Sequence, residues 1–187
     1  MIRQLVHRNR SYRRFDQSKS ISKQTLRDLV DLARLSASAA NLQNLRFWLV
    51  DHPDNDVFSC LRWANYLKNW DGPMEGERPA AYIIVLGPQN FTKFTSFDAG
   101  IACQSILLGA TEIGLGGCIL ASVDKEKLQK LEGIPSDWEI MLVIALGVPA
   151  EEVVIDNIGE GGNIEYYRDE KGRHHVPKRD LDILILN

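Results

Sequence analysis

The N-terminal segment holds the densest group of side chains that could bind a ligand. Residues 8–15 read RNRSYRRF, in which Arg10 and Arg13 are three positions apart, so a helix or a turn places both on one side. Guanidinium groups bind phosphate in a bidentate manner, and the Ser11 hydroxyl adds a neutral donor or acceptor. The segment predicts a site for a small anion, although a solvated basic face accounts for the same composition.

Two further polar clusters lie elsewhere in the chain. Residues 36–43 read SASAANLQ; the small side chains allow close approach of a flat ligand, and the Asn41 and Gln43 amides can each donate and accept hydrogen bonds. Near the C-terminus, Lys178 and Arg179 form a second basic pair. Each cluster alone is equally typical of a polar loop or a charged tail, but the three together indicate a binding site.

The sequence excludes several other kinds of site. Gly114 and Gly116 suggest a dinucleotide-binding loop, but Ile119 stands where the third glycine belongs, and the turn follows a predicted helix. The motifs GxxxxGK[ST], HExxH, CxxC and GxSxG are absent. His174 and His175 are adjacent, and on a strand they would face opposite sides, so they cannot share one metal ion. We therefore expect no catalytic triad and no metal.

Charge and cysteine content narrow the class of protein further. Residues 1–34 carry nine Lys or Arg against three Asp or Glu, whereas the remainder carries 13 against 22. One basic patch on an acidic chain suits a small anion better than a nucleic acid, which needs a broad positive surface. The only cysteines are Cys60, Cys103 and Cys118, which form no disulfide framework or zinc motif and point to the reducing cytoplasm. The longest apolar runs have seven residues, too few to span a membrane.

Hydrophobic periodicity predicts the elements that would position these clusters. Helices are expected at 2–8, at 22–36 with Ser22 as N-cap, at 54–68, at 96–113 and at 124–133. Strands are expected at 46–50, 80–87, 116–122 and 139–147. The tail, 150–187, is polar and predicted to be irregular, with a strand at 163–168 and a helix at 179–186. The sum is a single domain, 1–187, of the α+β class.

Four segments, taken in order, closely resemble the nitroreductase family of flavoproteins over essentially the whole chain. They are RSYRRF (10–15), SASAANLQNLRFWLV (36–50), DAGIACQSILLGATEIGLGGC (98–118) and HHVPKR (174–179). The resemblance implies a mostly antiparallel central sheet packed among helices, in an intertwined homodimer. It also implies two FMN molecules at the dimer interface, each contacted by both protomers.

The resemblance assigns flavin contacts residue by residue. In one protomer, it places Arg10 and Ser11 near the phosphate and ribityl chain and Arg13 near the pyrimidine edge, where a cation favours the anionic reduced flavin. From the other protomer, the resemblance implies contacts by Ala37, Ser38, Ala39, Asn41 and Gln43. Backbone groups of Ala121 and Ser122 would approach the central ring, and Lys178 and Arg179 would hold the phosphate.

Two positions depart from the family pattern. Asn9 stands where a second arginine is frequent, so Arg8 would have to replace that phosphate contact. Asn44-Leu45 follows Gln43, where the family has Pro-Trp, which changes the wall of the substrate pocket. Trp63, Tyr66 and Trp70 would form one stripe on a helix, either as core packing or as an aromatic wall over the flavin.

The implied activity is reduction of a nitroaromatic, quinone or similar small acceptor by NADH or NADPH in a ping-pong reaction. The flavin would carry the chemistry, so no catalytic side chain is expected. Two alternatives stay open: other flavin chemistry on the same fold, such as dehalogenation or biosynthetic ring oxidation, and non-enzymatic flavin binding.

Overall fold

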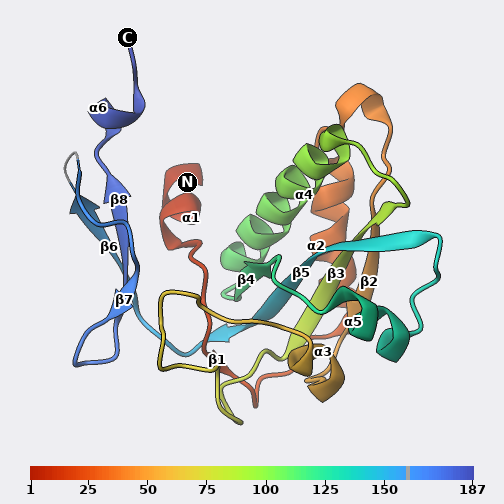
Figure 1. The fold of residues 1–187 in the computed structure, drawn as a ribbon, viewed down its shortest axis with the longest axis horizontal. Coiled ribbons are helices and arrows are strands. Elements are labelled where there is room, and N and C mark those ends of the chain that lie inside the picture. The colour runs from red at the N-terminus through yellow and green to blue at the C-terminus, as the bar shows by residue number, and fades with distance from the viewer. Residues whose placement is uncertain (159–160) are drawn as a thin grey trace.

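A computed structural model describes residues 1–158 and 161–187 (Figure 1). Its main sheet has five strands in the order β1-β5-β3-β2, with β4 also paired to β5, and every pairing is antiparallel. The long β5 pairs with β3 along one edge and with β4 and β1 in succession along the other. The strands are β1 (Phe15–Asp16), β2 (Arg46–Val50), β3 (Ala81–Pro88), β4 (Gly116–Leu120) and β5 (Trp138–Pro149).

Helices cover both faces of this sheet. Successive side chains of β3 point to opposite faces of the sheet. Ile83 and Val85 pack against the helices on one face, and Tyr82 and Ile84 pack against the helices on the other face. One face is covered by α2 (Lys23–Leu35) and α4 (Lys93–Glu112), the other by α3 (Asn55–Ser59) and α5 (Lys125–Glu132). The chain is α+β, as predicted, and the central sheet is antiparallel.

Local capping signals were reliable guides to the helices. The Ser22 hydroxyl accepts a hydrogen bond from the Thr25 N–H at 3.0 Å, which confirms the predicted N-cap of α2. Gly133 ends α5 in the left-handed conformation at φ 64°. A short helix, α1 (Ile2–Arg8), opens the chain as expected.

The predicted helix at 54–68 is wrong, because α3 ends at Ser59. Beyond it, the backbone bonds to the segment after β4: the Arg62 N–H donates to Ser122 O at 3.0 Å. The aromatic stripe therefore does not exist. Trp63 packs against core residues and contacts the Phe58 ring, whereas Tyr66 and Trp70 contact residues of the tail.

The tail is more ordered than its composition indicates. Three strands form a second sheet in which β6 (Val153–Ile158) runs parallel to β8 (His174–Arg179), and β7 (Tyr167–Arg168) pairs antiparallel with β8. The predicted strand at 163–168 is limited to β7, and the terminal helix is limited to α6 (Leu181–Leu184). Figure 1 shows this tail sheet to one side of the main sheet.

Candidate functional site

The N-terminal arginines line a surface groove of about 350 Å³ between the main sheet and the tail sheet. We call it the arginine groove; its lining residues are Asn9, Arg10, Ser11, Arg13, Gln104, Leu107, Ile119, Tyr166, His174, Val176 and Lys178. The chain turns tightly here, with the Tyr12 N–H donating both to Arg10 O at 2.9 Å and to Gly117 O at 3.0 Å. The turn fixes the basic segment beside β4 and brings Arg10 and Arg13 to the same groove.

A buried carboxylate from the tail holds this segment in place. The Glu151 side chain is 1% exposed, and its Oε1 accepts hydrogen bonds from the backbone N–H groups of Arg13 and Arg14. Its Oε2 accepts from Arg168 Nη2 at 3.1 Å, and the Arg168 guanidinium lies over the Trp70 ring. Three donors thus compensate the burial of one charge.

The Arg13 guanidinium contacts two aromatic side chains of the tail. Its Nη1 lies 3.1 Å from His174 Nε2, and its Cζ lies 4.7 Å from the centre of the Tyr166 ring. Because arginine only donates, His174 Nε2 is the acceptor and the imidazole proton is on Nδ1. Burial, together with the positive charges of Arg13 and Arg168, lowers the pKa of His174 from 6.5 to about 4. The imidazole is neutral at pH 7.

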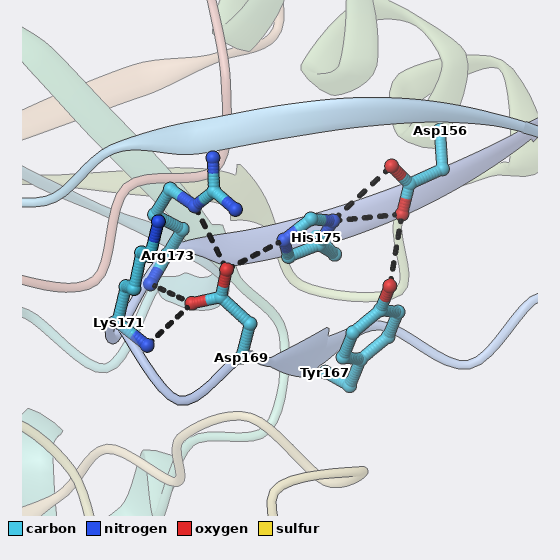
Figure 2. Close-up of polar contacts among 6 residues, drawn as sticks. All are labelled: Asp156, Tyr167, Asp169, Lys171, Arg173 and His175. Carbon is cyan, nitrogen blue, oxygen red and sulfur yellow. Dashed lines mark hydrogen bonds and ion pairs between the residues drawn. The ribbon is translucent and has the colours of Figure 1, made fainter.

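On its other side, β8 is fixed by a polar network (Figure 2). His175 lies between two carboxylates, with Nδ1 2.9 Å from Asp156 Oδ2 and Nε2 3.3 Å from Asp169 Oδ2. The Tyr167 ring stacks on the imidazole, and Arg173 Nε donates to Asp169 at 2.8 Å. Since side chains alternate along a strand, His174, Val176 and Lys178 face the groove while His175 faces this network.

The same alternation separates the predicted basic pair. Both side chains are exposed, but Lys178 lines the arginine groove and Arg179 does not. Asn9 lines the groove. Arg8, the expected substitute for a second arginine, instead donates to the Thr111 carbonyl of α4 at 3.3 Å.

The second predicted cluster lies at a different cavity, of about 260 Å³, which we call the loop pocket. It shares no lining residue with the arginine groove; its lining residues are Val30, Ala33, Arg34, Ser36, Ala37, Ser38, Gln43, Leu45, Arg46, Phe47, Asp98 and Ala102. Ala39 and Asn41 belong to the same loop, in the short helix η1 (Ala39–Asn41), but do not line the pocket.

Asp98 of α4 holds this loop. The residue is 6% exposed, and its carboxylate accepts hydrogen bonds from the Ser38 hydroxyl at 2.8 Å and the Ala39 N–H at 2.9 Å. The loop needs such support because Ala40, Asn41 and Gln43 all have positive φ, at 49°, 54° and 52°.

The remaining predicted contacts lie just beyond β4. Ala121 and Ser122 are exposed, and the Ser122 carbonyl accepts the Arg62 N–H. Neither lines the arginine groove, although Ile119 of β4 does.

Sequence reasoning missed the residues that organise both sites. The sequence assigns no individual role to His174, Glu151, Tyr166 or Asp98. Only a tertiary contact reveals these residues. Arg13, which contacts both Glu151 and His174, is 138 and 161 positions away from them in the sequence. Among residues 1–158 and 161–187, no group of three or more His, Cys, Asp or Glu side chains could hold a metal ion, and no helix is long and apolar enough to span a membrane.

The protein is an α+β fold in which helices cover an antiparallel sheet and arginines line a groove at the edge of the sheet. Comparison with known protein families shows which family has this fold. Residues 6–148 match the model of the nitroreductase family, and the chain belongs to this family. No curated protein matches the sequence.

Solved structures share the fold at low identity. A nitroreductase family protein from Streptococcus pneumoniae TIGR4 aligns with a TM-score of 0.68 at 16% identity, over 81% of this chain and 92% of that one. An FMN-dependent nitroreductase from Clostridium difficile R20291 aligns at 0.64 and 21% identity, over 81% and 89%. The NADPH:FMN oxidoreductase of Vibrio harveyi, solved with NAD+, aligns at 0.61 and 20% identity, over 79% and 68%.

Proposed function

We propose that this protein is an FMN-dependent oxidoreductase that takes electrons from NADH or NADPH and passes them to a small acceptor, such as a nitroaromatic or a quinone, in a ping-pong reaction. One observation carries the proposal. Four side chains expected to contact the flavin, from opposite ends of the chain, line the same groove: Arg10, Ser11, Arg13 and Lys178.

The donors of the groove suit the phosphate of FMN. Arg10, Lys178 and the Ser11 hydroxyl supply cationic and neutral donors. Arg10 Nε is buried and has no hydrogen-bond partner among the described residues, and a buried donor of this kind favours an anionic ligand. When bound, FMN would accept hydride from the nicotinamide and return the electrons to the acceptor. Arg13 would stabilise negative charge on the isoalloxazine, and Arg10, Ser11 and Lys178 would fix the phosphate.

We propose a homodimer in which the arginine groove of one protomer and the loop pocket of its partner share a flavin. The separation of these two cavities in one chain supports this arrangement. So do the exposed apolar side chains, which gather on α4 and in the tail: Phe94, Phe97, Ile101, Leu181, Leu184 and Leu186. The proposed compartment is the cytoplasm, in keeping with three buried free cysteines.

The visible absorbance spectrum of the purified protein tests the activity. We expect flavin bands that bleach on anaerobic addition of NADH or NADPH and return with a quinone or nitroaromatic. Flavin bands that do not bleach would favour flavin storage or another donor. Slow reoxidation by these acceptors would favour the dehalogenation or ring-oxidation alternatives. A colourless protein that takes up no FMN would refute the proposal.

One double variant and two single variants test which side chains anchor FMN. Arg10→Ala combined with Arg13→Ala should give a folded dimer that lacks FMN. Lys178→Ala and Arg179→Ala remove the same charge from adjacent positions of one strand, and only Lys178 lines the groove. We expect Lys178→Ala to weaken FMN binding about tenfold, and Arg179→Ala to weaken it less. Stoichiometric FMN in the double variant would mean that the anchor lies elsewhere.

A further inference from the structure

We propose that His174 is a positioning residue: its neutral imidazole accepts a hydrogen bond from Arg13 and holds that guanidinium at the flavin face of the groove. The inference rests on the proposed function in one respect, that Arg13 faces the flavin. The buried His174 has no part in the proposed binding of the phosphate, and the inference gives it a role.

The Arg13 guanidinium is held from three directions. Nη1 donates to His174 Nε2 at 3.1 Å and to the Ser11 carbonyl at 3.0 Å, and the guanidinium plane contacts the Tyr166 ring. Tyr166 is itself packed edge-on against Tyr66 and lies 5.2 Å from the His174 ring. These contacts occupy Nη1 and one face of the guanidinium, which leaves the other N–H groups for the groove.

A neutral acceptor suits this position better than a carboxylate. A carboxylate at the same place would pair with Arg13 and cancel the charge that the groove presents. The imidazole accepts a hydrogen bond without adding negative charge, and His174 is fully buried, so a protonated ring beside Arg13 is unfavourable. The pair therefore keeps one positive charge at the groove, at a fixed place.

His174 is in turn held by its strand. Its backbone N–H donates to Glu152 O at 2.9 Å, and β8 pairs with β6. The neighbouring His175 is bound by Asp156 and Asp169 on the opposite side (Figure 2). The acceptor for Arg13 is thus part of a rigid sheet, which is what a positioning role requires.

Three variants separate positioning from simple stabilisation of the tail. His174→Phe removes the acceptor and keeps a ring, His174→Gln restores an acceptor, and His175→Gln weakens the same strand without touching Arg13. The measurements are the FMN dissociation constant and the two-electron midpoint potential of the bound flavin. We expect His174→Phe to weaken FMN binding about tenfold, or about 1.4 kcal/mol, and to make the potential more negative.

We expect His174→Gln to recover most of both changes. We expect His175→Gln to lower the melting temperature and leave the potential unchanged. An unchanged potential in His174→Phe would overturn the proposal. An equal shift in His175→Gln would also overturn it, because the effect would then come from the stability of the strand.

A measurement on the FMN-free protein keeps this inference distinct from the proposed function. Nitrogen-15 NMR of the histidine side chains should show His174 neutral with its proton on Nδ1, and the Nε2 resonance should move in Arg13→Gln. If the wild-type protein takes up no FMN, the proposed function fails, and the NMR result alone decides whether His174 holds Arg13. A proton on Nε2 would overturn the inference in either case.

Discussion

The buried His174 ties the stability of the fold to pH over a defined window. Its pKa is about 4 in the folded protein and 6.5 when unperturbed. Between these values the unfolded chain binds a proton that the folded chain does not, so stability rises with pH. The folded state is therefore expected to lose stability as pH falls from about 6.5 towards about 4, with no further loss from this group below that.

The size of the effect follows from the two pKa values. Between about pH 7.5 and about pH 5, linkage predicts a loss of about 2 kcal/mol in the free energy of unfolding. Asp169 acts in a different window. Burial raises its pKa, but hydrogen bonds from Arg173 and His175 outweigh this and hold the pKa below its ordinary 3.8. The stability that Asp169 contributes is present above that value and is lost only at lower pH.

Urea unfolding followed by tryptophan fluorescence at several pH values measures this dependence, with the FMN content of all samples held equal. His174→Phe has no titrating group at this position. Over the same pH interval, the free energy of unfolding of the wild type should therefore fall by about 2 kcal/mol more than that of His174→Phe. Subtracting the two curves cancels the titration of all other groups. Parallel curves would refute the argument, since they would mean that His174 titrates alike in both states.

Two other substitutions test the contacts that hold the sites, and a third tests the core away from them. Glu151→Ala leaves Arg168 partly buried without its carboxylate and should lower the free energy of unfolding by about 3 kcal/mol, measured by urea titration. Asp98→Ala removes both hydrogen bonds to the Ser38 loop and should weaken FMN binding about tenfold while the far-ultraviolet circular dichroism is unchanged. Leu128→Ala, at a fully buried site, should cost about 3 kcal/mol of stability and leave the flavin spectrum unaltered.

The elements of the main sheet could be predicted because their signals are local. β3 and residues 140–146 of β5 are continuous apolar segments, and both are buried between helices, as such segments require. Ser22 and Gly133 mark helix ends through their own side chain or backbone. A pattern that depends only on neighbouring residues is readable without knowing the fold.

The failures have a common cause in tertiary contacts. Residues 60–70 carry aromatic side chains at helical spacing, but their backbone bonds to the segment after β4. The rings of Tyr66 and Trp70 contact residues of the tail, about a hundred positions away. The sequence does not predict the tail sheet because β6 pairs in parallel with β8, about twenty residues further along the chain. Parallel strands are not joined by a hairpin turn, so no turn motif in the sequence indicates this pairing.

The candidate site divides in the same way. Arg10, Ser11 and Arg13 could be found because a dense basic segment is visible in the sequence, and Lys178 because it matches a family motif. The residues that fix them could not, since a lone buried histidine or glutamate looks like any other until its partner is known.

This division also follows the boundary of the family match. The match to the family model ends at residue 148, yet Glu151, Tyr166, His174 and Lys178 all follow it and form one side of the arginine groove or hold its basic segment. The segment between α1 and β1 supplies the arginines, and residues of the tail hold Arg13 and its backbone. Because a flavin's redox behaviour depends on the charges fixed around it, the tail residues that hold Arg13 would influence the potential of the proposed flavin.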